Sequence, residues 1–178
     1  MAKKSFPLSK VYSLLEPGPV VLVTTARKGH ANVMTMTWHT MMEFEPPLVG
    51  CVISGNNYSF AALVATKECV INIPTADMVR TVVKVGSITG ARLDKFATCG
   101  LTPLPAAQVK APLIDECYAN LECRVVDSRL VNKYNFFVLE VVKAWIDPAK
   151  KDPRTLHHRG RGRFAIDGET IKLPFNKK

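Results

Sequence analysis

The stretch between residues 31 and 60 constrains the fold most, because it predicts two strands and a helix in direct succession. Residues 32–38 alternate strictly, which is typical of a β-strand. The two faces carry, in turn, Val33, Thr35 and Thr37, and then Met34, Met36 and Trp38. Neither face is charged, so we expect one in the core and the other lining a cavity or a subunit interface. An ordinary buried barrel strand would show the same alternation.

The second half of the stretch predicts a strand, a turn and a helix. Residues 48–53 are an apolar run of strand length after Pro46-Pro47, which ends any preceding element. The run stops at Ser54-Gly55-Asn56-Asn57, where Asn57 or Asn56 can cap a helix over residues 58–65. Such a junction offers backbone N–H groups, hydroxyls and the positive end of a helix dipole, which suit a phosphate. A plain turn that binds nothing is the alternative.

The rest of the chain predicts more strands than helices. Strands are expected over residues 20–25, 68–73, 119–130 and 134–146, with tight turns at 27–30 and 131–133. Helices are expected over residues 76–85, capped by Thr75 and ended by Gly86, and over 90–96, before a loop at 101–105. Strands joined by tight turns pair antiparallel. The sequence therefore predicts a mainly β protein, an antiparallel Greek-key-like barrel of about six strands with three short helices and residues 32–38 as its central strand.

Five motifs in order resemble the flavin reductase-like family, which includes the flavoredoxins, over roughly residues 17–147. The motifs are Asn32-x-Met34-Thr35-x-Thr37-Trp38, Pro46-Pro47 with its apolar strand, the turn from Ser54 to Ser59, Val70-Ile71-Asn72-Ile73-Pro74, and Gly86-Ser87-x-x-Gly90-x-x-x-Asp94-Lys95-Phe96. The resemblance implies an FMN-binding split β-barrel. It also implies a homodimer with the flavin near the subunit boundary, which agrees with the uncharged second face of the strand at 32–38.

FMN imposes physical demands that these motifs can meet. Its flat ring needs an apolar wall with a few N–H and hydroxyl groups, and its phosphate needs amides, hydroxyls and a cation. The resemblance implies that Lys95 supplies the cation, whereas composition alone favours a solvent-facing helix lysine. The predicted FMN-binding residues are Asn32, Met34, Thr35, Met36, Thr37, Trp38, Ser54, Asn56, Asn57, Tyr58, Ser59 and Lys95.

Flavin chemistry needs no catalytic side chain, because hydride passes between two cofactors held face to face. We therefore expect an FMN-dependent oxidoreductase, either an NAD(P)H:flavin reductase or a flavoredoxin-like carrier. Its electron donor would be NAD(P)H or a redox protein. A barrel for a non-redox ligand such as haem or a tetrapyrrole, and a basic nucleic-acid-binding protein, are the alternatives. No G-x-G-x-x-G follows a strand, so a Rossmann domain is not expected.

Positive charge is concentrated near the C-terminus of what we expect to be one domain over residues 1–178. The net charge is +9, and residues 148–178 form a basic extension containing the run from His157 to Arg163. The run is short and holds no aromatic residue to stack bases, which disfavours nucleic-acid binding. It is then either a solvated loop or a segment that completes the site. The resemblance implies the latter, with His157 or His158 contacting the ring or guiding an anionic donor.

Composition sets further limits. The 178 residues suffice for one domain with a real core, and no apolar run approaches the roughly 20 residues that cross a bilayer. The first residues lack the apolar core of a signal peptide, so a cytoplasmic protein without a membrane partner is expected. The five cysteines show no zinc spacing, so no metal site is expected. Cys51, Cys69 and Cys123 are expected to be buried, although a redox role for Cys51 is an alternative.

Overall fold

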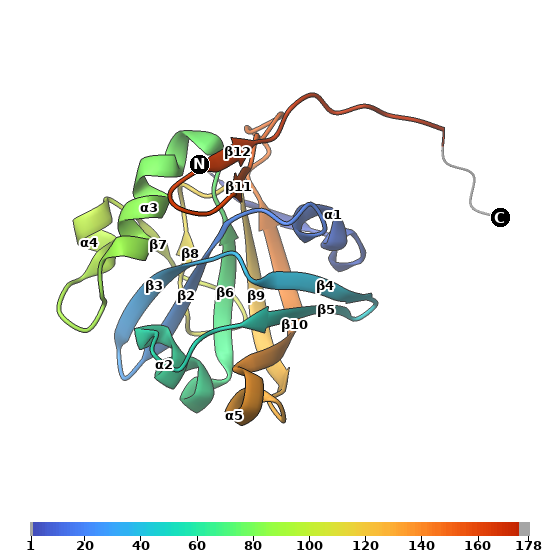
Figure 1. Ribbon diagram of the computed structural model, residues 1–178. Helices are drawn as coiled ribbons and strands as arrows, with labels where there is room; N and C mark the ends of the chain where they lie inside the picture. The colour runs from blue at the N-terminus through green and yellow to red at the C-terminus, as the bar shows by residue number, and fades with distance from the viewer. Residues whose placement is uncertain (1, 175–178) are drawn as a thin grey trace.

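A computed structural model describes residues 2–174 of the chain (Figure 1). Eight strands form one antiparallel sheet in the order β3-β2-β6-β9-β10-β5-β4, and β1 also pairs with β10. The strands are β1 (Lys4–Phe6), β2 (Val21–Arg27), β3 (His30–Met36), β4 (His39–Phe44), β5 (Pro47–Val52), β6 (Glu68–Ile73), β9 (Ala119–Asp127) and β10 (Phe136–Ile146).

The ends of the sheet, β3 and β4, follow one another in the chain and are joined by Thr37 and Trp38 alone. Within residues 2–174 these two strands do not pair, so the barrel is split between them. The predicted fold class, a mainly β antiparallel split barrel, is confirmed. The prediction of a central strand over residues 32–38 is wrong, because β3 is an end strand and stops at Met36.

Short elements complete the fold. The helices are η1 (Leu8–Lys10), α1 (Tyr12–Leu15), α2 (Tyr58–Thr66), η2 (Ala76–Met78), α3 (Val79–Ser87), α4 (Lys95–Cys99) and α5 (Val131–Tyr134). Two small sheets pair β7 (Pro103–Leu104) with β8 (Leu113–Ile114), and β11 (Leu156–His158) with β12 (Phe164–Ile166). The predicted numbers of six strands and three helices are therefore too low. The missed elements are too short to show a periodic pattern.

Three predicted boundaries are wrong for local reasons. The helix expected over residues 90–96 begins only at Lys95, because the Asp94 carboxylate accepts hydrogen bonds from the N–H groups of Phe96 and Ala97 and so fixes the start of α4. Gly86 lies within α3 and does not end it. The turn expected at residues 131–133 is the helix α5, which ends at Asn135 in the left-handed conformation.

The two faces of β3 pack against different layers. Met34 and Met36 belong to the barrel interior, whereas Val33 packs beneath α3 with Val82 and Val85. The Thr35 hydroxyl donates to the carbonyl of Val82 at 2.7 Å. Figure 1 shows α3 lying beside β3. The uncharged second face of β3 is thus covered by the chain's own helix, and the inference from that face to a subunit interface is wrong.

The cysteines behave as buried thiols. Cys51, Cys69 and Cys123 lie in the barrel interior, as predicted. Burial raises the pKa of the Cys51 thiol, so the reactive thiolate is disfavoured and a redox role for Cys51 loses its support. Over residues 2–174 we find no cluster of three or more His, Cys, Asp or Glu side chains that would hold a metal ion. None of the helices described above is long and apolar enough to cross a membrane.

Candidate functional site

A cavity of about 170 Å³ lies where the start of β3, the N-terminus of α2 and the segment between α3 and α4 meet. Eight of the twelve predicted residues line it: Asn32, Met34, Thr35, Asn56, Asn57, Tyr58, Ser59 and Lys95. Sequence reasoning missed the lining residues Val85, Gly86, Ile88, Thr89 and Gly90, although both glycines belong to the fifth motif. Small-molecule pockets usually measure about 300–1,000 Å³, so this cavity suits one end of a ligand.

Two backbone donors are available at the start of α2. The N–H groups of Tyr58 and Ser59 have no acceptor within residues 2–174. Asn57 occupies the N-cap position, but its side chain makes no capping hydrogen bond. Free N–H groups and the positive end of the helix dipole favour an anion at this position.

Ser59 and Asn32 tie α2 to β3 at the base of the cavity. The Asn32 amide Nδ2 donates to the Ser59 Oγ at 2.8 Å, and Ser59 is only 1% exposed. The Ser59 hydroxyl therefore keeps its own proton, for which the described part of the chain supplies no acceptor. Because the Ser59 oxygen accepts a hydrogen bond from Asn32, its own O–H proton is free to be donated to a ligand in the cavity.

Lys95 brings a buried positive charge to the same cavity. Its side chain is only 6% exposed, and its Nζ donates to the carbonyl of Val85 at 2.9 Å. It forms no ion pair with any carboxylate in residues 2–174. Burial lowers the pKa of the Lys95 ammonium below its usual 10.5. A solvent-facing lysine is therefore wrong for this position, and a buried cation with unused donors suits a phosphate.

The other predicted flavin-binding residues lie elsewhere. Met36 is buried in the barrel, whereas Thr37 and Trp38 follow the end of β3, with Trp38 71% exposed. The Ser54 Oγ accepts the Asn56 N–H at 3.3 Å inside the turn before α2. The structure does not bring these four residues to the cavity, and their contact with a flavin stays a prediction.

The predicted histidine pair lies in the β11–β12 hairpin. The His157 Nε2 is 2.6 Å from an Asp167 carboxylate oxygen, and its Nδ1 is 3.2 Å from the carbonyl of Gly18. The ring of His158 packs against Phe164. The Val20 N–H also donates to the Leu156 carbonyl, so this part of the basic extension docks on the domain. Neither histidine lines the cavity, and their predicted contact with flavin or donor stays a prediction.

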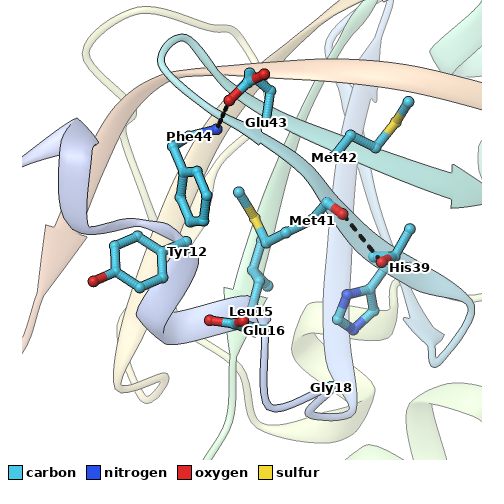
Figure 2. A pocket seen from close by; sticks show the side chains of 10 residues that line it. Tyr12, Leu15, Glu16, Gly18, His39, Met41, Met42, Glu43 and Phe44 are labelled. Atoms are coloured by element: carbon cyan, nitrogen blue, oxygen red, sulfur yellow. Dashed lines mark hydrogen bonds between the residues drawn. The ribbon is translucent and has the colours of Figure 1, made fainter. Parts of the chain in front are cut away.

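A larger cavity of about 460 Å³ lies between α1 and β4 (Figure 2). The rings of Tyr12 and Phe44 meet edge to face beside it, with centroids 5.0 Å apart. Among the described residues, its charged lining residues are Glu16 and Glu43, with no lysine or arginine. The His39 Nε2 lies 2.7 Å from the Pro19 carbonyl, and burial lowers the pKa of this imidazole. This cavity therefore lacks the cation that a phosphate requires.

Gly90 allows the close packing that shapes the candidate cavity. A Cβ atom at this position would lie 2.0 Å from the Asn32 Oδ1 and 3.0 Å from the Tyr58 Cδ1. Gly90→Ala is therefore expected to displace Asn32 and to lower the free energy of unfolding by about 1–2 kcal/mol. Thermal unfolding should detect a drop of about 2–8 °C in Tm.

Gly168→Ala is the matched control for this variant, because a Cβ there meets nothing within 4 Å. Its melting temperature should stay close to that of the parent protein. If Gly90→Ala also melts at the parent temperature, Gly90 and Asn32 are not in close contact.

The chain is similar to known proteins both in sequence and in structure. A sequence model described as the flavin reductase like domain matches residues 14–165. A solved FMN-binding domain of a flavin reductases-like enzyme from Shewanella baltica is 27% identical, covers 97% of this chain and 98% of its own, and superposes with a TM-score of 0.91. Flavoredoxin of Desulfovibrio vulgaris is 25% identical, with coverage of 89% and 91% and a TM-score of 0.79. An uncharacterized protein of Archaeoglobus fulgidus is 36% identical over 121 residues, which are 68% of each chain.

These matches confirm the resemblance and the fold class, and they agree with FMN as the expected cofactor. The matched region contains all five motifs and every residue of the candidate cavity. The curated relatives such as the A. fulgidus protein carry no described activity.

Proposed function

Because the chain belongs to the flavin reductase-like family, we propose that it is an FMN-dependent oxidoreductase. It takes electrons from a reduced donor, NAD(P)H or a redox protein, and passes them to flavin or another acceptor. The observation that carries this proposal is a set of donors at one cavity that find no acceptor in residues 2–174. They are the N–H groups of Tyr58 and Ser59, the Ser59 hydroxyl and the two N–H bonds of the Lys95 ammonium that Val85 does not use. This set matches the terminal phosphate of FMN in charge and in hydrogen-bonding capacity.

The chain's own residues bind and orient the cofactor. The start of α2 and Lys95 would hold the phosphate in the small cavity, which Thr35 also lines. Bound FMN supplies the hydride-accepting ring. Hydride transfer requires no acid or base from the protein. The functional residues are therefore those that would hold the flavin and leave one face of its ring open.

We also propose that the protein works as a homodimer. Trp38, Met42 and Phe44 are 71%, 49% and 57% exposed and follow one another along the β3–β4 connection and β4. Exposed apolar residues gathered on one edge favour a protein partner. A second copy placed there would lie near the open side of the flavin.

Sedimentation at micromolar concentration should show a dimer. Phe44→Glu should shift the protein toward monomer, because it places a charge in the apolar surface. Val126→Glu, at a half-exposed residue on β9, three places from β4 in the sheet order, should not. If the parent protein sediments only as a monomer, the proposed homodimer is wrong.

The proposed activity is tested by anaerobic reduction of the FMN-loaded protein. We expect NADH or NADPH to abolish the visible absorption of the flavin, and oxidation by an added acceptor to restore it. Reduction by a redox protein alone would identify an electron carrier. A colourless protein that cannot be reconstituted with FMN, or one that holds haem instead, would refute the proposal.

A further inference from the structure

The larger cavity between α1 and β4 is separate from the candidate flavin site. The two cavities share no lining residue among those described. At about 460 Å³, the larger one lies within the usual range of small-molecule pockets, about 300–1,000 Å³. The proposed function gives it no role, and the groups that line it indicate which kind of ligand it suits (Figure 2).

The charged groups of the lining are carboxylates. Glu16 directly follows α1, and its carboxylate has no hydrogen-bond or ion-pair partner in residues 2–174. One oxygen of the Glu43 carboxylate accepts the Phe44 N–H at 2.7 Å, which leaves the other oxygen without a partner in the same residues. Although the chain has a net charge of +9, these carboxylates make the cavity locally negative.

His39 adds no positive charge to this lining. Its Nε2 faces the Pro19 carbonyl, and because a carbonyl only accepts, this nitrogen carries the ring proton. Burial lowers the pKa of the imidazole, which favours the neutral ring. The His39 Nδ1 is then an acceptor, and it is buried without a hydrogen-bond partner in residues 2–174. Like the two carboxylates, the imidazole therefore offers an acceptor to a ligand that carries N–H donors.

The rest of the lining is mostly apolar and polarisable. The Tyr12 and Phe44 rings meet edge to face, and Leu15, Met41 and Met42 lie around them (Figure 2). Aromatic faces attract cations, and the thioether of methionine is polarisable. A metal ion is disfavoured, because residues 2–174 contain no cluster of three His, Cys, Asp or Glu side chains to hold one. The lining thus suits a cation that is organic.

We propose that this cavity binds an organic ammonium ion with an apolar body, such as an arylalkylamine. The ammonium group pairs with the carboxylates of Glu16 and Glu43. The apolar body lies against Met41 and the rings of Tyr12 and Phe44. The proposal does not depend on the proposed function, because no residue of the phosphate cavity takes part.

Three probes with one phenyl ring and different charges test this assignment. Amide chemical shifts followed during titration of the protein report both the affinity and the place of binding. 2-Phenylethylammonium should bind about tenfold more tightly than the neutral 2-phenylethanol, and the anionic phenylacetate should bind more weakly than either. The tenfold follows from two exposed ion pairs, each contributing a factor of up to about five.

The double variant Glu16→Gln/Glu43→Gln should remove the preference for the amine. Its affinity for 2-phenylethylammonium should fall about tenfold, to that for 2-phenylethanol, which should not change. Glu45→Gln is the matched control, because Glu45 directly follows β4 and does not line the cavity. It should alter neither affinity. The double variant should bind FMN and sediment like the parent, so that a lost ammonium site is not confused with a lost flavin site or dimer.

Other outcomes would overturn the ammonium site and leave the flavin proposal intact. Equal affinities for the amine and the alcohol would show that the cavity is merely apolar, and an amine affinity that survives in the double variant would place the amine elsewhere. If no probe binds, the cavity is closed to small ligands. A second copy would then be its occupant, because Met42 and Phe44 also belong to the proposed dimer surface.

Discussion

Replacing Lys95 by methionine is expected to weaken FMN binding by about ten- to a hundredfold, part of the whole phosphate contribution, and to leave riboflavin binding nearly unchanged. The Lys95 ammonium is buried beside the start of α2, where its two unused N–H donors face no carboxylate of the described chain. A charge-assisted hydrogen bond contributes about 1.5–3 kcal/mol, and each tenfold in affinity is about 1.4 kcal/mol. Riboflavin lacks the phosphate and so does not use this cation. Quenching of flavin fluorescence on titration with the apoprotein measures both affinities.

The stability of the apoprotein separates lost binding from misfolding. Burial lowers the pKa of Lys95, so the charged form disfavours folding at neutral pH, and this penalty is relieved as the pH rises toward the unfolded value of 10.5. Lys95→Met removes the penalty, and the apo variant should therefore melt at or above the parent temperature at pH 7. A variant that melts lower, or that loses both flavins alike, would show that Lys95 supports the fold and does not hold the phosphate.

Glu122→Gln is expected to lower the free energy of unfolding by about 3 kcal/mol. Glu122 is fully buried on β9, and its carboxylate accepts from the N–H groups of Ala107, Gln108 and Val109 and from the Trp145 indole, at 2.5–3.2 Å. A glutamine would set its own N–H₂ group against these donors, and a buried unsatisfied donor costs about 1–3 kcal/mol in addition to the lost charge-assisted bonds. Denaturant unfolding should show the loss as a lower midpoint.

Glu116→Gln provides the matched control for Glu122. The Glu116 carboxylate also accepts from a backbone N–H group, that of Thr102 at 3.1 Å, but it lies near the surface. Water can replace that bond, so the control should lose less than about 1 kcal/mol. Equal losses of unfolding free energy in the two variants would mean that burial does not strengthen the contribution of the Glu122 hydrogen bonds to stability.

Local pattern predicted the parts of the fold that depend on neighbours in sequence. The strand over residues 68–73 coincides with β6 because its apolar run is bounded by a polar residue and Pro74. The alternation at Met34 and Met36 correctly predicted a barrel face. The same pattern continued to Trp38 and so overextended the strand, because alternation does not show where hydrogen bonding to the neighbour stops.

Less of the site can be predicted from local sequence patterns, because its hydrogen-bond donors come together only through tertiary packing. The turn at Ser54 to Ser59 was visible as a helix start, but the position of Lys95 beside it depends on how α3 and α4 fold back over β3. Composition alone favoured a solvent-facing lysine, and only the family resemblance placed Lys95 at the phosphate. Gly90 belongs to the fifth motif, but its close approach to Asn32 arises only from the tertiary packing of the two segments.

The flavin-binding account is tested most directly by comparing the affinities of the parent apoprotein for FMN and riboflavin. If the N–H groups of Tyr58 and Ser59, the Ser59 hydroxyl and Lys95 hold the phosphate, FMN should bind at least about a hundredfold more tightly. Titration of both flavins under one set of conditions, followed by fluorescence quenching, gives the ratio. Equal affinities would mean that the phosphate is not bound at this cavity, and the site would have to lie elsewhere on the barrel.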